Sequence, residues 1–171
     1  MKKLFSLLML ALPAVASSHA VFEQPQVTSG SYYKATLGIS HGCEGAATTK
    51  VSIEIPEGIE HARPMPKTGW KIAITRQALK TPYESHGQTV TEDVSTITWY
   101  GGELADDYFD EFVFKAKVSA DPQTLYLPVR QTCITGENYW HEIPQGDKKW
   151  HEYDEPAPFL EVIAPETSHH H

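Results

Sequence analysis

The sequence predicts an all-β protein built as an antiparallel β-sandwich, and two observations support this expectation. Helical periodicity is hard to find anywhere after residue 20. Short segments rich in aromatic and β-branched residues recur instead, with apolar and polar residues alternating between turn signals. Several short strands at such a spacing are typical of sandwiches.

The strand pattern appears in seven segments of the chain. The segment 51–55 alternates strictly and ends at the turn residues of 56–58, and the segment 94–100 ends at a pair of glycines. The Pro-containing stretch 56–66 is predicted to be an ordered loop rather than a linker. In chain order, the predicted strands are 32–39, 51–55, 70–75, 94–100, 109–118, 124–133 and 159–163.

Residues 1–18 have the layout of a secretory signal peptide. Positive residues at Lys2 and Lys3 precede a nearly unbroken apolar run over 4–12, and mostly small residues follow Pro13. The apolar run is too short to cross a bilayer, which needs roughly 20 residues. No second long apolar run follows, so we expect an exported mature chain without a membrane span.

The cleavage point decides which residue comes first in the mature chain. Small residues stand at or near the required positions for three cuts, which would leave Ser17, His19 or Val21 as the first residue. The rule for small residues rates the cut before Ser17 at least as highly as the cut before His19. The position rule alone therefore leaves the three cuts open.

The remaining chain is long enough for one domain with a substantial core. We expect this domain over residues 19–165, followed by a histidine-containing tail over 166–171. The three terminal histidines are typical either of a purification tag or of a natural metal-scavenging tail. From His19 onward the chain carries 12 basic and 22 acidic residues, a formal charge of −10. Such an acidic surface argues against nucleic-acid binding and is compatible with collecting a cation.

The two cysteines, Cys43 and Cys133, predict a disulfide. An even pair in an exported protein is typical of a disulfide, and the chain has no CxxC spacing. The bond would close a loop of 90 residues and tie an early strand to a late one. The alternative is a pair of thiolates that bind copper.

The common catalytic motifs of hydrolases, metalloproteases and nucleotide-binding enzymes do not occur in the sequence. No pair of histidines has a recognised ligand spacing. The stretch Trp140-His141-Glu142 is echoed by Trp150-His151-Glu152, and both stretches are most simply interpreted as loops with an aromatic residue at the edge. Besides His19 and the tail, the histidines are His41, His61, His86, His141 and His151.

His19 differs from the other histidines if it is the first residue of the mature chain. A terminal histidine offers two nitrogens, the free α-amine and the imidazole Nδ1, which together close a six-membered chelate ring. Nitrogen donors suit Cu(II), which also has the highest affinity in the divalent series. The amine has a reference pKa of about 8, so copper can displace its proton near neutral pH.

The chain resembles the YcnI-like family of bacterial proteins over nearly the whole predicted mature chain. The resemblance begins at His19-Ala-Val-Phe-Glu and continues through short matches whose order and spacing fit the family. These matches are Gly30-Ser-Tyr-Tyr-Lys-Ala-Thr, His41-Gly-Cys-Glu-Gly-Ala-Ala-Thr-Thr, Ile55-Pro-Glu-Gly, Pro64-Met-Pro-Lys-Thr-Gly-Trp, Phe109-Asp-Glu-Phe-Val-Phe-Lys-Ala, Trp140 and Pro156-Ala-Pro.

The resemblance implies an immunoglobulin-like sandwich in the periplasm that binds Cu(II) through a single-histidine brace. Carried over, the brace residue is His19, which selects the cut after Ser18. The tryptophan of the family site matches Trp140, which we expect to lie over the metal as an apolar lid or a cation–π neighbour, since a neutral indole nitrogen is only a donor. For the acidic partner we prefer Glu111 over Glu23 and Glu142. Unlike some members of the family, the chain lacks a C-terminal membrane span.

Strand alternation supports the choice of Glu111. If Phe112 and Phe114 face the core, Glu111 faces the other way and lies near the surface. We therefore expect a Cu(II)-binding protein of copper trafficking or homeostasis, with other periplasmic copper chaperones as partners. A copper-dependent oxidative enzyme is the alternative, and the missing second brace histidine argues against it.

Overall fold

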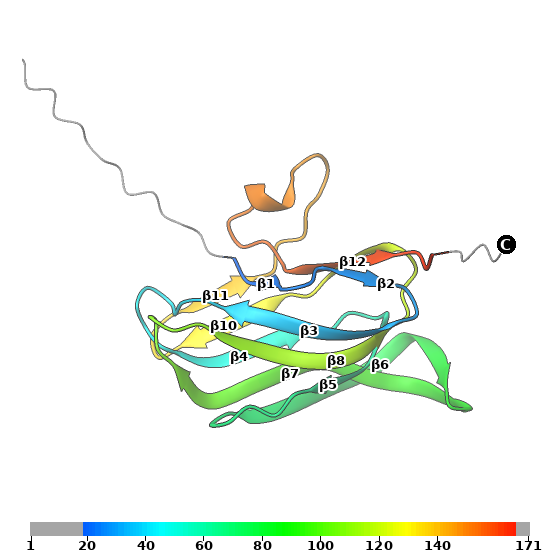
Figure 1. Ribbon diagram of the computed structural model, residues 1–171, viewed down its shortest axis with the longest axis horizontal. Coiled ribbons are helices and arrows are strands. Elements are labelled where there is room, and N and C mark those ends of the chain that lie inside the picture. Colours follow the sequence, from blue (N-terminus) through cyan, green and yellow to red (C-terminus); the bar gives the residue numbers. More distant parts are fainter. Residues whose placement is uncertain (1–18, 167–171) are drawn as a thin grey trace, which may run out of the picture.

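The computed structural model describes residues 19–166, and this part of the chain is built almost entirely of β-strands (Figure 1). A single short 3-10 helix lies in the described part. The strands are β1 (Val21–Phe22), β2 (Gln26–Thr28), β3 (Tyr32–Ile39), β4 (Thr48–Glu54), β5 (Ile59–Pro64), β6 (Lys71–Ser85), β7 (Gln88–Leu104), β8 (Asp110–Val118), β9 (Gln123–Tyr126), β10 (Val129–Cys133), β11 (Glu137–Trp140) and β12 (Phe159–Ile163), and the 3-10 helix is η1 (Trp150–Glu152).

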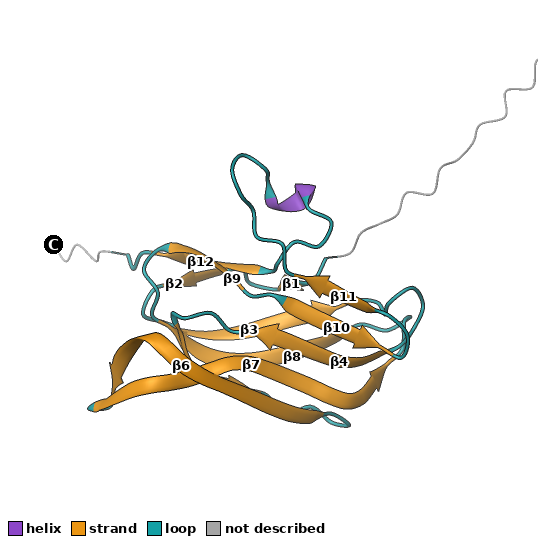
Figure 2. Ribbon diagram, turned by 180° about the vertical axis from the view of Figure 1, so that it is seen from behind, coloured by secondary structure: helices purple, strands orange, loops and turns teal. Residues whose placement is uncertain are grey.

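Two antiparallel sheets form the sandwich, as the views from both sides show (Figures 1 and 2). One sheet has the strand order β1-β3-β8-β5, and the other has the order β11-β10-β4-β7-β6. A third, smaller sheet of order β2-β12-β9 lies beside them, with a parallel pairing between β2 and β12. The predicted all-β sandwich is confirmed.

Aromatic side chains from the two main sheets meet in the core. Trp99 on β7 and Phe112 on β8 are fully buried, and their ring centroids lie 5.7 Å apart. Phe114, two residues farther along β8, faces the same interior because side chains alternate along a strand. Phe22 of the short strand β1 packs edge-on against Phe114 at 6.4 Å. This contact fixes β1, and with it the segment that begins at His19, against the sandwich.

The structure has a strand at each predicted segment, but it also has three short strands that were not predicted, β1, β2 and β11. β6 and β7 extend well beyond the predicted segments 70–75 and 94–100.

Two further differences concern the predicted strand 124–133 and the predicted loop 56–66. The predicted strand 124–133 is divided by Leu127 and Pro128 into β9 and β10. The predicted loop 56–66 is wrong, because β5 lies within it and pairs with β8. Its register shifts between Glu60 and Arg63, around His61 with a positive φ of 52°. An edge strand tolerates such a bulge and a terminal proline, and both disguise the pattern in the sequence.

The predicted disulfide between Cys43 and Cys133 is present, with a Cα–Cα distance of 5.9 Å. It joins the loop after β3 to the end of β10, and therefore links the two main sheets. Both cysteine sulfurs are in this bond, so in this form they are not the thiolate pair that was the alternative.

Among residues 19–166, the structure contains no helix long and apolar enough to cross a membrane. The predicted signal peptide over 1–18 lies outside the described residues, as does nearly all of the predicted tail over 166–171.

Candidate metal centre

The segment from His19 to Phe22 ends in β1, which is the outer strand of the four-stranded sheet. Ala20 and Phe22 are buried in the core, which places the alternate residues on the other side of this extended segment. β1 pairs with β3 so that Val21 stands opposite Gly38. His19 therefore lies just before the edge strand, near the end of β3.

A small hollow lies beside His19, between the two main sheets. Its volume is about 10 Å³, close to the space needed for one water-sized particle. The hollow therefore fits a single ion better than an organic molecule. It is lined by His19, Ala20, Gly38, Ile39, Ser40, His41 and Trp140.

Trp140 contributes to this hollow from the opposite sheet. It ends β11, the outer strand of the five-stranded sheet, and stands opposite Val129 of β10. Only 5% of Trp140 is exposed, and the side chain belongs to the hydrophobic core. In both overall views β1 and β11 lie side by side (Figures 1 and 2). The structure therefore brings His19 and Trp140 together, although they lie far apart in the sequence.

Glu111 lies in the same sheet as β1 and is not among the residues that line the hollow. The registers place Val21, Gly38 and Glu111 in one row across β1, β3 and β8. Gly38 has no side chain, and a Cβ atom built there would meet nothing within 4 Å. Glu111 is exposed, as the alternation predicted, and directly neighbours a residue that lines the hollow. β3 lies between the strand that carries Glu111 and the segment that carries His19, and the space over Gly38 is open.

A positive side chain fixes the backbone at Glu111. Lys67 donates a hydrogen bond of 3.0 Å from Nζ to the carbonyl oxygen of Glu111 and forms an ion pair of 2.5 Å with Asp110. The N–H of Glu111 donates to the Asp110 carboxylate at 2.8 Å. These contacts involve the backbone of Glu111, and its side chain takes no part in them.

The two other acidic candidates have different surroundings. The Glu142 carboxylate accepts a hydrogen bond of 2.7 Å from the N–H of Glu155 and so holds the loop after β11 closed. Glu23 faces Tyr33. Burial raises the pKa of Tyr33 to about 12, and the negative charge of Glu23 contributes to this rise. None of the three carboxylates lines the hollow. Glu111 stands opposite the lining residue Gly38, and Glu142 follows the lining residue Trp140 by two positions.

Trp150 is a neighbour of His19 that the sequence did not reveal. Its ring meets the His19 ring edge-on, with centroids 5.2 Å apart. The indole is held in place by a hydrogen bond of 2.7 Å from Nε1 to the carbonyl oxygen of Ala157 and by an edge contact with Phe159. Trp150 belongs to η1 in the loop that projects beyond β11 and β12 (Figure 1). The echo between the two Trp-His-Glu stretches was the only sequence signal for it.

If His19 begins the mature chain, its α-amine and imidazole are a pair of nitrogen donors that suits Cu(II). In the part of the chain that the structure describes, no three His, Cys, Asp or Glu side chains gather as a metal cluster. A brace takes two nitrogens from one residue and needs no such cluster. An oxygen donor would have to come from outside the hollow, because no carboxylate is among the residues that line it. Cu(II) accepts oxygen alongside nitrogen.

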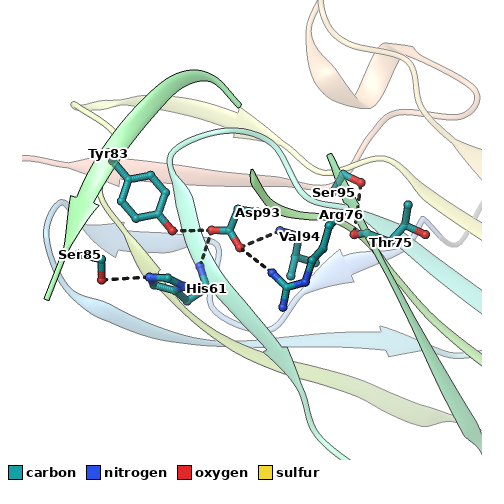
Figure 3. A network of polar contacts seen from close by, with 8 residues as sticks. All are labelled: His61, Thr75, Arg76, Tyr83, Ser85, Asp93, Val94 and Ser95. Atoms are coloured by element: carbon teal, nitrogen blue, oxygen red, sulfur yellow. Dashed lines mark hydrogen bonds and ion pairs between the residues drawn. The ribbon is translucent and has the colours of Figure 1, made fainter. Parts of the chain in front are cut away.

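A second polar centre lies at the other end of the sandwich, around Asp93 (Figure 3). The Asp93 carboxylate accepts hydrogen bonds from the Tyr83 hydroxyl at 2.6 Å and from the N–H groups of His61 at 2.8 Å and Val94 at 2.7 Å. Burial alone would raise the pKa of Asp93, but these hydrogen bonds outweigh it and hold the pKa below its usual value.

Asp93 also helps to line a second hollow, which is larger than the one beside His19 and has a volume of about 400 Å³. Two of its acidic residues have basic partners. Arg76 lies 3.7 Å from Asp93, and Lys117 lies 3.4 Å from Glu60. The hydrogen bonds and ion pairs around Asp93 therefore join the long β6–β7 hairpin to β5. This polar centre lies apart from His19 in the fold.

Comparison with known proteins establishes the family. Residues 19–162 match the family model described as "Domain of unknown function (DUF1775)". The chain belongs to this family, which includes the YcnI-like proteins, so the resemblance seen in the sequence is confirmed at the family level.

Among solved structures, the chain is similar to an uncharacterized protein from Nocardia farcinica whose structure reveals an immunoglobulin-like fold. The two are 23% identical, with a TM-score of 0.63, and the match covers 84% of this chain and 97% of the other. This likeness confirms the immunoglobulin-like form of the sandwich. No curated protein matches the chain.

Proposed function

We propose that this protein is a periplasmic Cu(II)-binding protein of copper trafficking or homeostasis, and that His19, as the first residue of the mature chain, holds the metal. The observation that carries the proposal is the placement of His19 on an ion-sized hollow whose far wall is Trp140. The match to the family begins at the same residue.

In this proposal the α-amine and Nδ1 of His19 bind Cu(II), and the Glu111 carboxylate supplies an oxygen. The buried indole of Trp140 covers the apolar side of the site and excludes water from it. An ion-sized hollow supports a role in holding the metal. Copper chaperones that exchange the ion are the partners implied.

Titration of the apo protein with Cu(II) against a competing chelator tests the proposal. The mature chain should carry His169, His170 and His171 replaced by alanine, so that the tail cannot contribute. We expect one tight site per chain. His19→Ala keeps a terminal amine but loses the chelate ring, so tight binding should be lost.

Glu111→Gln should weaken binding less than His19→Ala, because a water molecule can take the oxygen position. A loss on the order of tenfold is expected, no larger than that of a residue outside the ligand set, because the water molecule replaces the oxygen donor. Glu23→Gln is the matched control, because Glu23 is also exposed but its charge acts on Tyr33, and this variant should bind as the parent does. Unchanged affinity in His19→Ala would refute the proposed site.

A further inference from the structure

The loop between β11 and β12 projects from the sandwich and brings Trp150 to His19 (Figure 1). The two rings meet edge-on, with an interplanar angle of 89° and centroids 5.2 Å apart. An edge-to-face arrangement at such a distance is a favoured geometry for aromatic rings. His19 lies two residues before β1, whose pairing with β3 begins at Val21. The contact with Trp150 therefore orients a ring that stands just outside the sheet.

The indole of Trp150 is itself fixed by the chain that leads into β12. Its Nε1 donates a hydrogen bond of 2.7 Å to the carbonyl oxygen of Ala157, which is fully buried. Its ring also meets the ring of Phe159, the first residue of β12, with centroids 5.8 Å apart. Trp150 is therefore tied to the sandwich rather than to the exposed part of its loop.

The neck of this loop, where its two ends meet, is closed by several hydrogen bonds. Glu142 and Pro156 form a parallel β-bridge. The N–H groups of His141 and Glu142 donate to the carbonyl oxygen of Glu155 at 2.8 and 2.9 Å, and the N–H of Ala157 donates to that of Glu142 at 2.9 Å. The Glu142 carboxylate accepts a further hydrogen bond of 2.7 Å from the N–H of Glu155. The loop thus presents Trp150 from a closed base.

From these contacts we infer that Trp150 is a positioning residue for the imidazole of His19, and that Glu142 acts through Trp150 by holding the neck of the loop closed. Neither side chain is a ligand in this account. The inference rests on the proposed function, because the loop then presents one orientation of the His19 ring to Cu(II). It also gives Glu142, a candidate for the acidic ligand, a different role.

Two substitutions at Glu142 distinguish a ligand from a residue of the neck. Glu142→Gln removes the negative charge but keeps a side-chain oxygen that can accept from the N–H of Glu155. Glu142→Ala removes both the charge and the acceptor. If Glu142 acts through the neck, the glutamine variant should bind Cu(II) as the parent does, and the alanine variant should bind more weakly. A ligand would be weakened by both substitutions.

Nuclear magnetic resonance of the apo mature chain, with alanines at 169–171, tests the positioning without copper. The ring current of the indole shifts the ring protons of His19, so Trp150→Ala should move these resonances toward the values of an unfolded chain. Glu142→Ala should move them in the same direction while Trp150 is kept. His151→Ala is the matched control, because His151 is exposed on the same helix η1, and it should leave them unchanged.

Cu(II) titration of the same variants measures the consequence for the metal. Residues that orient a metal-binding histidine typically contribute about 10–100-fold to affinity. Trp150→Ala should therefore bind Cu(II) at least about 10-fold more weakly than the parent, with a changed electron paramagnetic resonance spectrum. His151→Ala should match the parent in both measurements.

The outcomes separate this inference from the proposed function. Unchanged His19 resonances in Trp150→Ala would overturn the inference, as would Cu(II) affinity equal to that of the parent. Equal losses of affinity in Glu142→Gln and Glu142→Ala would overturn the role of Glu142 in the neck and make it a ligand. A parent that binds no Cu(II) would refute the proposed function, and the His19 resonances would still support or overturn the positioning by Trp150.

Discussion

A mature chain with one residue added before His19 should bind Cu(II) at least about 100-fold more weakly than the native chain, because a direct ligand should matter more than the roughly 10–100-fold contributed by supporting residues. The extension converts the α-amine of His19 into a peptide nitrogen. The added residue is N-acetylated, so that its own amine cannot form a new chelate with the imidazole of His19. The imidazole of His19 and the rest of the hollow remain. The loss therefore isolates the amine, which His19→Ala cannot do.

A removable extension gives this experiment its control. Cu(II) affinity is measured before and after a protease removes the added residue from the same preparation, so that folding and concentration are matched. The cut should restore native affinity. Equal affinity before and after the cut would place the site elsewhere, with His41, His141 and His151 as the next residues to test.

Replacing both cysteines by alanine should destabilise the fold by roughly 4 kcal/mol, the chain-entropy value for a closed loop of this size. Cys43 and Cys133 are 90 residues apart, so the bond restricts a large part of the unfolded chain. Urea unfolding of the parent and the double variant measures the difference. Reducing the parent with a thiol reagent before unfolding should give a similar loss.

The same cysteines should be inaccessible to thiol reagents in the exported protein. Labelling under denaturing, non-reducing conditions should find no free thiol. Two labelled cysteines that become protected only by added copper would contradict the structural role of the bond and would make the thiolates ligands.

Local alternation was sufficient to predict most of the sandwich. The segments 32–39 and 159–163 have the predicted bounds, because each combines β-branched and aromatic residues with clear ends. β1 and β11 escaped prediction since two to four residues are too few to show a period. β5 escaped for a different reason: its bulge at His61 and its terminal Pro64 interrupt the alternation.

For the proposed site around His19, the sequence could predict the properties that depend on single residues. The chelating chemistry of His19 and the exposure of Glu111 follow from the residues themselves. Their neighbours depend on long-range pairing, and no local pattern specifies that Gly38 stands between Val21 and Glu111 or that a loop before Cys43 brings His41 to the same hollow. Trp150 reaches His19 from a loop with no strand pattern, so only its repeated Trp-His-Glu motif hinted at a role.

The mass of the exported protein tests the central claim most directly, since every copper contact proposed for His19 requires its free α-amine. The full chain, expressed with residues 1–18 and recovered from the periplasm, is measured intact under conditions that retain bound metal. We predict a chain that begins at His19 and carries one copper ion. A mature chain that begins at Ser17 or Val21 would contradict the brace.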